Sequence, residues 1–219
     1  MKILGVSGSP LKDSNTDRAL MAALEATGMD YEYVKLIDYT FAPCKACLGC
    51  VSTNVCVIKD DGITLAEKAK AADALIIAGF TPYSTLDART KAFIERLYPL
   101  RHRYGFMQGK PGGIIITSAV PENCDMLPPA SDNGINAITY YMMEEGMDIM
   151  DDPVKVLGNV PCVRCKYGDD CDMTGIKMMF GPEASKCSVG INKFKEQLES
   201  VDAAKELGNN IAGKLKSKE

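Results

Sequence analysis

The chain has 219 residues, of which 46% are hydrophobic and 25% are charged, and its formal net charge is -4. This length suits one globular domain with an elaboration. The negative charge argues against nucleic acid or an anionic membrane as the main partner, because both select a basic face. The opening MKILGVSGSP holds too short an apolar run for a signal peptide, and no run in the chain approaches the length that spans a bilayer. We therefore expect a cytoplasmic chain.

Apolar runs alternate with amphipathic stretches along the first 159 residues. This pattern predicts strands at 2–6, 31–37, 74–80, 112–119 and 153–159, and helices at 15–28, 64–72, 85–98 and 134–146. Ser84 and Asp87 are placed as a capping box for the third helix. Apolar strands that alternate with helices specify a parallel sheet covered on both faces. We predict an α/β fold, a flavodoxin-like, doubly wound sheet of five parallel strands in the order 2-1-3-4-5, with cysteine-rich loop insertions.

The segment SGSPLKDSNT follows the first strand, where a doubly wound sheet binds its ligand. It has neither the glycine pattern of a dinucleotide fold nor the lysine of a P-loop. Its hydroxyl and amide side chains can instead donate to a phosphomonoester such as that of FMN, aided by the N-terminus of the next helix. The alternative is an ordinary turn with Ser14 or Asn15 as N-cap. The predicted phosphate contacts are Ser7, Ser9, Ser14, Asn15 and Thr16.

Two further loops are predicted to line the same crevice. The loop after the third strand, TPYSTLDA, can offer backbone N–H groups to the pyrimidine side of a flavin. Tyr83 would either lie against the flavin ring or pack on its own loop. The predicted flavin contacts of these two loops are Pro82, Tyr83, Ser84, Thr85 and Leu86, followed by Thr117 and Ser118 after the fourth strand.

Nine cysteines in a reducing compartment indicate metal ligands rather than disulfides. The first four are Cys44, Cys47, Cys50 and Cys56, spaced C-x2-C-x2-C-x5-C. Three evenly spaced sulfurs with a fourth nearby favour a [4Fe–4S] cluster, because tetrahedral zinc more often uses two separated C-x2-C pairs. Structural zinc and free thiols remain the alternatives.

A second set of four cysteines follows the fifth strand: Cys162, Cys165, Cys171 and Cys187. A long loop without secondary structure is uncommon in a compact domain unless something organises it. We therefore expect these thiolates to bind one metal centre, a second [4Fe–4S] or a structural zinc, with ordinary thiols as the alternative. The remaining Cys124 is most simply a small apolar residue. The single histidine, His102, is predicted to be a solvated loop residue.

Together, the Ser-rich first loop, the cysteine motif, the DDGI after it and TPYSTLDARTKAFIER resemble the iron–sulfur flavoproteins, which are relatives of the NADPH-dependent FMN reductases. The resemblance covers about residues 1–155. It implies one FMN and one [4Fe–4S] per subunit, and a homodimer or dimer of dimers in which electrons cross between subunits. It assigns the cluster to the first four cysteines and the FMN phosphate to the loop at 7–16.

The expected function is therefore an FMN and [4Fe–4S] oxidoreductase. Electrons from NAD(P)H or ferredoxin would pass to a small-molecule or protein acceptor, because flavin exchanges two electrons or one whereas a cluster moves one at a time. The cluster is expected beside the FMN crevice. Residues 1–159 would be the FMN-binding domain, with the cluster loop at 43–60, and 160–219 a cysteine-bearing loop followed by a polar, solvated or partner-facing helix at about 191–216. The alternatives are a non-catalytic electron carrier, an NAD(P)H-dependent FMN or quinone reductase with structural zinc at the cysteine sites, and a binding module that is held together by zinc and does not bind flavin.

Overall fold

The computed structural model describes residues 1–122, 124 and 126–218, and within them it contains one parallel sheet. The strands are β1 (Lys2–Ser7), β2 (Asp30–Lys35), β3 (Ala74–Phe80), β4 (Pro111–Ser118), β5 (Asp148–Ile149) and β6 (Val154–Leu157). Their order is β2-β1-β3-β4-β5, with β6 also paired to β4. The predicted order is confirmed, and its fifth position is divided, because β5 pairs with the start of β4 and β6 with its end.

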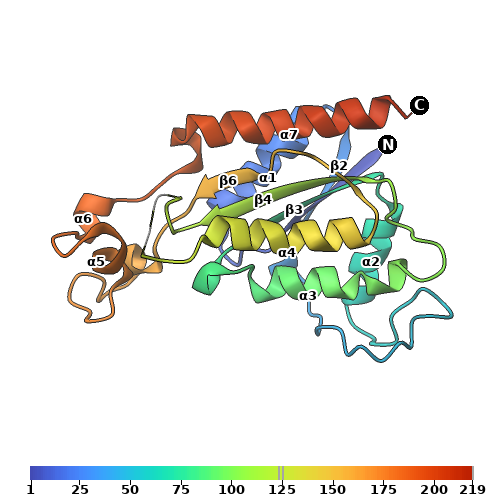
Figure 1. Ribbon diagram of the computed structural model, residues 1–219, viewed down its shortest axis with the longest axis horizontal. Coiled ribbons are helices and arrows are strands. Elements are labelled where there is room, and N and C mark those ends of the chain that lie inside the picture. Colours follow the sequence, from blue (N-terminus) through green and yellow to red (C-terminus); the bar gives the residue numbers. More distant parts are fainter. Residues whose placement is uncertain (123, 125, 219) are drawn as a thin grey trace.

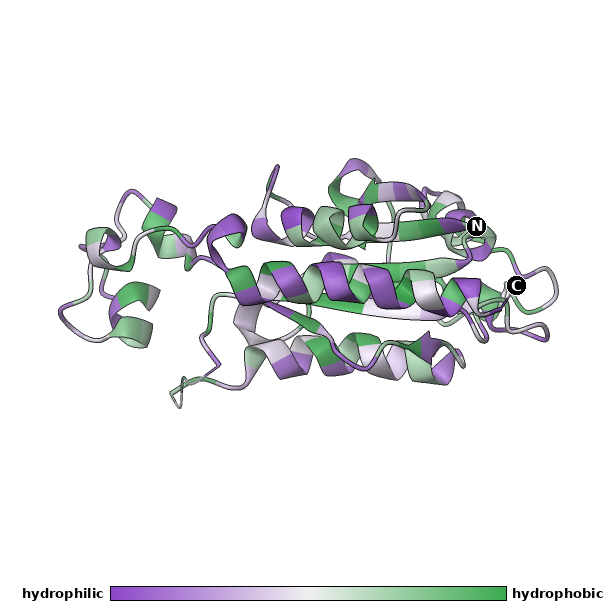
Figure 2. Ribbon diagram, turned by 90° about the horizontal axis from the view of Figure 1, so that it is seen from above, coloured by the Kyte–Doolittle hydropathy of each residue, from purple (hydrophilic) through white to green (hydrophobic). Residues whose placement is uncertain are grey.

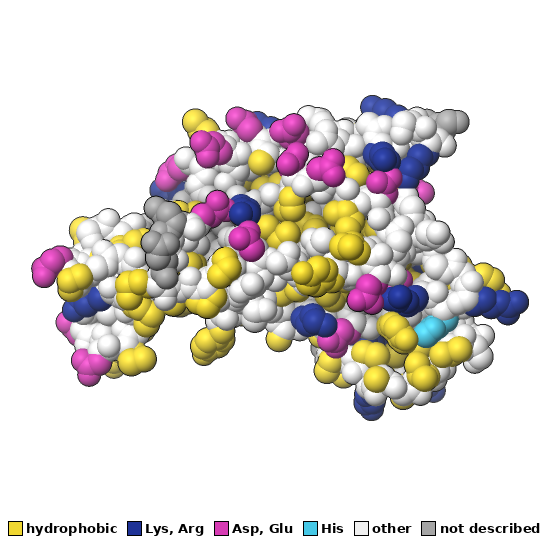
Figure 3. Space-filling model, viewed as in Figure 1, with side chains coloured by type: hydrophobic (Ala, Val, Ile, Leu, Met, Phe, Trp, Pro, Cys, Tyr) yellow, Lys and Arg dark blue, Asp and Glu magenta, His cyan; other side chains and the backbone are white. Residues whose placement is uncertain are grey.

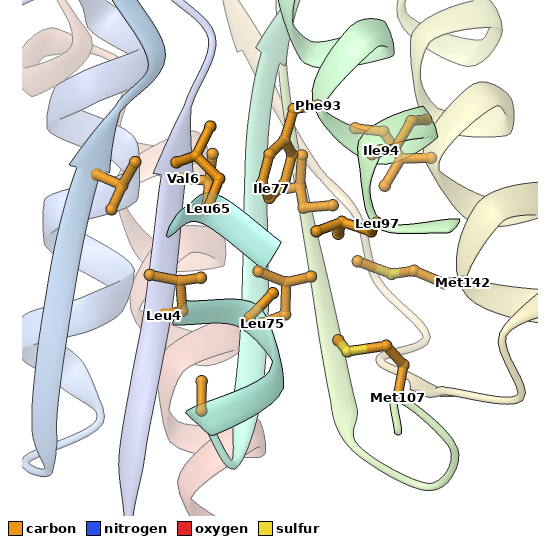
Figure 4. Packing of buried hydrophobic residues seen from close by; sticks show 14 of the residues in the cluster. Leu4, Val6, Leu65, Leu75, Ile77, Phe93, Ile94, Leu97, Met107 and Met142 are labelled. Carbon is orange, nitrogen blue, oxygen red and sulfur yellow. The ribbon is translucent and has the colours of Figure 1, made fainter. Parts of the chain in front are cut away.

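Helices cover both faces of this sheet (Figure 1). These are α1 (Asn15–Ala26), α2 (Gly62–Ala71), α3 (Ala88–Arg96), α4 (Ala130–Glu144) and α7 (Leu198–Lys216). The short helices α5 (Gly175–Phe180) and α6 (Lys186–Val189) lie beyond the end of the sheet. Alternate residues of the central strands serve the two faces, as the period of a strand requires. Leu75 and Ile77 of β3 pack with Leu65 and Phe93 under α2 and α3 (Figure 4), whereas Ile76 packs on the α1 and α7 side.

The C-terminal helix α7 is part of the core, so the prediction of a solvated or partner-facing helix is wrong. Leu207 and Ile211 are buried with residues of α1 and β4. Gly208 permits this approach, since a β-carbon there would lie 2.1 Å from the carbonyl oxygen of Ala23. The helix therefore covers one face of the sheet. Within the described ranges, no helix is long and apolar enough to cross a bilayer.

A lobe of about residues 160–191 projects beyond the carboxyl end of the sheet (Figure 1 and Figure 2). It was expected to lack secondary structure, and that expectation is wrong. Thr174 caps α5 by accepting a hydrogen bond from the Ile176 N–H, and Ser185 forms a capping box with Ser188 at α6. Local capping residues thus organise part of this lobe.

Candidate functional site

The carboxyl ends of β1, β3 and β4 bring the three predicted cofactor loops to one edge of the sheet. The Gly8 N–H donates to the Ala78 carbonyl at 2.8 Å, and the Thr81 N–H donates to the Thr117 carbonyl at 3.2 Å. The Thr16 hydroxyl donates to the Thr117 hydroxyl at 2.9 Å. The three loops therefore meet at the carboxyl edge of the sheet, the position where doubly wound sheets bind ligands, and this edge is the predicted cofactor crevice.

A buried ion pair, which the sequence analysis overlooked, lies beneath the first loop. Asp17 lies 2.5 Å from the Lys35 ammonium and accepts the Ser7 hydroxyl at 2.6 Å. It also forms a capping box with Ser14, the N-cap of α1, and the S-x-x-D spacing at 14–17 was the missed signal. Burial works to raise the pKa of Asp17, but hydrogen bonds from Lys35, Ser7 and Ser14 outweigh it and hold that pKa below its usual value.

The predicted phosphate-binding residues therefore differ in whether their hydroxyl hydrogens are free to bond a phosphate. Ser7 donates its hydroxyl to Asp17, and Thr16 donates to Thr117. Ser9 is buried, its hydroxyl accepts the Leu11 N–H at 3.3 Å, and no acceptor for its own hydrogen lies among the described residues. Ser14 likewise accepts the Asp17 N–H, so Ser9 and Ser14 are the hydroxyls of this loop whose hydrogens are not engaged among the described residues.

Asn15 connects the first loop to the C-terminal part of the chain. Its side-chain amide donates to the carbonyls of Leu157 at 3.1 Å and Asn192 at 3.0 Å, and it accepts the Phe194 N–H at 3.1 Å. Asn159 and Asn192 exchange two further bonds, of 3.0 and 2.7 Å. These asparagines close the neck of the lobe. With both side-chain hydrogens engaged, Asn15 can serve a phosphate through its backbone N–H.

The loop after β3 holds two successive residues in the left-handed backbone region. Tyr83 has φ 51° and ψ 38°, and Ser84 has φ 57°. The Asn133 side chain of α4 holds this conformation by donating to the Ser84 carbonyl at 2.9 Å. Such strain in non-glycine residues clusters at ligand sites. The Tyr83 side chain is fully exposed, at 103%, so the alternative in which it packs on its own loop is wrong.

The start of α3 is capped by Asp87, which accepts the Thr90 N–H at 2.8 Å. The predicted capping box with Ser84 is wrong, because Ser84 lies in the strained turn before the cap. Asp87 is buried, and desolvation raises its pKa. Gly8 packs against this cap, since a β-carbon there would lie 1.8 Å from the Thr90 hydroxyl oxygen. The first loop and the start of α3 are thus in direct contact.

The four cysteines of the first set line one small pocket, whose opposite wall is formed by Arg96, Tyr98 and Pro99 after α3. The Cys50 sulfur lies 3.3 Å from His102 Nε2, so the prediction that His102 is a solvated loop residue is wrong. Burial raises the pKa of the Cys50 thiol, and the three other cysteines raise it further. Within the described ranges no three acidic, histidine or cysteine side chains are grouped tightly enough to hold a metal ion.

Arg96 clamps both ends of the cysteine loop. Its guanidinium, 1% exposed, bonds both carboxylate oxygens of Asp60 at 2.7 and 2.8 Å and donates to the Ala42 carbonyl at 2.7 Å. It also packs on Gly62, where a β-carbon would lie 2.5 Å from the guanidinium carbon. Residues 42 and 60 bracket the four cysteines, so one buried side chain fixes the base of the loop. The sequence analysis missed it because Arg96 is 36 residues from Asp60.

The donor set of this pocket suits a thiolate-bound cluster. Four soft sulfur ligands come from one short loop, and the guanidinium next to them offsets their negative charge. Cys56 lines the same pocket as Arg96, and the pKa of Arg96 is raised, first by Asp60 and also by the nearby Cys56 sulfur.

The cysteine loop does not lie beside the crevice of its own chain, which corrects the prediction. The crevice meets the start of α3 at Asp87, whereas the cysteine pocket lies against Glu95 and Arg96 at its end (Figure 1). Nine helical residues at about 1.5 Å each separate the two positions by roughly 13 Å along the helix axis. The physical cause is the Arg96 clamp, which draws the loop under the far end of α3.

The second cysteine set lies in the lobe. The Gly175 N–H points to the Cys162 sulfur at 3.4 Å, and the Lys186 ammonium donates to the Cys165 carbonyl at 2.9 Å. These contacts bring the segments that carry Cys162, Cys165 and Cys187 together. The described side chains are not grouped at metal-binding distances here either, and one shared metal centre stays a prediction.

The sheet order, the crevice at its carboxyl end and the cysteine loop define a flavodoxin-like protein of the flavin-binding class. Residues 1–126 match the family of NADPH-dependent FMN reductases, and the chain belongs to that family.

Its relatives include proteins that carry an iron–sulfur name. The chain is 36% identical over 118 residues to the iron–sulfur flavoprotein of Methanosarcina thermophila, covering 52% of this chain and 62% of that protein. It is 35% identical over 122 residues to an iron–sulfur flavoprotein of Archaeoglobus fulgidus, covering 54% and 55%. The matches thus span less than two thirds of the length of these relatives.

Solved structures agree on the fold alone. An archaeal flavodoxin superposes with a TM-score of 0.55 at 17% identity, covering 99% of each chain. A flavone reductase superposes with a TM-score of 0.63 at 14% identity, covering 97% of this chain and 62% of its own.

Proposed function

We propose that the protein is an FMN and [4Fe–4S] oxidoreductase that passes electrons from NAD(P)H or ferredoxin to a small-molecule or protein acceptor. The observation that carries this proposal is the single pocket lined by Cys44, Cys47, Cys50 and Cys56 on a loop held at both ends. Membership of the NADPH-dependent FMN reductases supports FMN as the second cofactor, and the names of the relatives support an iron–sulfur cluster.

The chain's own residues would bind and orient these cofactors. Ser9 and the backbone N–H groups at the start of α1 would hold the FMN phosphate, together with the other predicted residues of that loop. The strained turn at 82–86 would present N–H groups to the flavin, and Thr117 and Ser118 would form the adjoining wall. When bound, FMN exchanges electrons in pairs or singly and the cluster moves them one at a time. No acid or base catalyst is assigned.

We also propose that the protein assembles as a homodimer or a dimer of dimers. The crevice and the cysteine pocket of one chain lie at opposite ends of α3, so a partner's loop set against the crevice would shorten the path between the two centres. Val51, Val55 and Val57 of the cysteine loop are 47%, 46% and 55% exposed, which suits burial by a second copy. Reduced thiols, which cluster ligation requires, fit the cytoplasm.

The test is anaerobic purification followed by a visible spectrum and by FMN, iron, sulfide and zinc analysis. We expect one FMN and at least four irons per chain, the iron of one cubane. Cys47→Ser should lose that iron and keep FMN, while the matched variant Cys124→Ser should keep both. A colourless protein with zinc at the cysteine sites would refute the proposal. Reduction by ferredoxin but not by NAD(P)H would identify the carrier rather than the reductase.

A further inference from the structure

His102, the only histidine of the chain, contacts one sulfur of the cysteine pocket. Its Nε2 atom lies 3.3 Å from the sulfur of Cys50. In Figure 3, apolar side chains gather around this histidine, on the part of the surface that carries the cysteine loop. Cys50 is 8% exposed, whereas Cys47 is open to solvent. Water has little access to the Cys50 sulfur, and the imidazole is the polar side chain that it meets.

The cysteine loop itself fixes the position of this imidazole. The side-chain amide of Asn54 donates to the carbonyls of Pro99 and His102, both at 2.7 Å. Asn54 has a left-handed backbone, with φ 56°, and its N–H donates to the Cys50 carbonyl at 2.8 Å. The Tyr98 ring meets the imidazole edge to face, with the ring centroids 4.7 Å apart. Backbone and ring of the histidine are thus both held next to the sulfur.

The direction of the hydrogen bond follows from the chemistry of the two groups. A thiolate that binds iron has no hydrogen to give, so the nitrogen that faces it must carry the hydrogen. A donor stabilises a sulfur more strongly as the negative charge on the sulfur grows. An iron–sulfur cluster becomes more negative when it is reduced, and hydrogen bonds to its sulfurs are among the properties that set its reduction potential. A donor at this position therefore favours the reduced state.

We propose that His102 donates a hydrogen bond from Nε2 to the Cys50 thiolate and thereby raises the reduction potential of the cluster. This inference rests on the proposed function, because it requires a cluster at the four cysteines. His102 acts as a positioning residue and not as a ligand, since the cysteines already supply the four ligands of a cubane. The step that it favours is the uptake of one electron from the reduced flavin. No bond to iron forms or breaks in this step, and the proton stays on Nε2.

The test is a redox titration of the anaerobically purified holoprotein, followed by electron paramagnetic resonance. His102→Phe keeps a ring and removes the donor, so it should make the cluster about tenfold harder to reduce, or about 59 mV for a one-electron couple. His102→Gln carries an amide N–H near the position of Nε2 and should keep the wild-type potential. Tyr104→Phe is the matched control, because it removes a hydroxyl from an exposed ring on the same loop that does not line the cysteine pocket.

A spectroscopic measurement on the wild type tests the contact without any substitution. Because the chain has one histidine, growth on ¹⁵N-histidine labels residue 102 alone. In protein purified without a histidine tag, electron spin-echo spectra of the reduced cluster should show a weak coupling to this label. Absence of coupling would overturn the contact. A strong coupling, which indicates a nitrogen bound to iron, would make His102 a ligand and would overturn the donor role.

The outcomes separate this inference from the proposed function. A wild-type protein that binds no iron would refute the proposed function and this inference with it. Full iron with equal potentials in the wild type and His102→Phe would overturn the inference alone. The same holds if His102→Gln has the potential of His102→Phe, or if the FMN potential shifts as far as that of the cluster. If His102→Phe loses its iron, the coupling in the labelled wild type decides.

Discussion

Replacing Arg96 with methionine should release the cysteine loop. The substitution keeps an unbranched side chain of similar length but removes the guanidinium, which is 1% exposed, from Asp60, which is 16% exposed. Removing one partner of a buried ion pair typically costs about 3 to 5 kcal/mol. Because water can still reach Asp60, we expect the lower end, about 3 kcal/mol. For a chain of this size that lowers Tm by about 6 to 12 °C if the whole fold shares the loss.

Urea unfolding followed by far-ultraviolet circular dichroism, with iron content after anaerobic reconstitution, measures this effect. Arg96→Lys is the matched control for charge, since its ammonium cannot span both oxygens of Asp60 and the Ala42 carbonyl. It should recover part of the stability and part of the iron. An Arg96→Met protein with wild-type stability and full iron would refute the clamp.

The dependence of folding stability on pH can be predicted from the Arg96–Asp60 pair. Hydrogen bonds from Arg96 lower the pKa of Asp60 to about 2, below the roughly 3.9 of an unfolded aspartate. The contribution of the pair is therefore complete above about pH 4 and is lost as the pH falls toward 2. Arg96→Met should flatten the stability profile in that window, and an unchanged profile would count against the pair.

Four further predictions concern the crevice, the neck of the lobe, its cysteines and the assembly. Ser9→Ala should weaken the binding of FMN by about 1.5 to 3 kcal/mol without changing the fold. Fluorescence titration measures this affinity, and an unchanged affinity would remove Ser9 from the site. Asn159→Ala should increase proteolysis within the lobe, because it removes both bonds from this side chain to the Asn192 backbone that close the neck, and wild-type resistance would contradict this. Cys165→Ser should lower metal content by about four irons, or by one zinc, and no change would mean ordinary thiols. Sedimentation of the loaded protein should show a dimer or larger, and a monomer would argue against transfer between subunits.

Local patterns were sufficient for the sheet. The apolar runs at 74–80 and 112–119 predicted β3 and β4 within one residue, because a strand buried on both faces admits little else. The two sets of four cysteines were likewise recognisable from spacing alone, and metal binding by them stays a prediction. The caps of α5 and α6 were available from sequence too, since Thr174 and Ser185 are ordinary N-cap residues, but the cysteine pattern led to a prediction of an unstructured loop.

The sequence by itself therefore determined the fold class and predicted the kinds of ligand for the loops, since hydrophobic period and cysteine spacing are local properties. Only the tertiary structure decided where those loops lie. Arg96 reaches Asp60 across 36 residues, Asn15 reaches Asn192 across 177, and His102 meets Cys50 across 52. No periodicity connects residues so far apart, because their meeting depends on how whole helices pack on the sheet. That packing places the cysteine loop at the far end of α3 from the crevice.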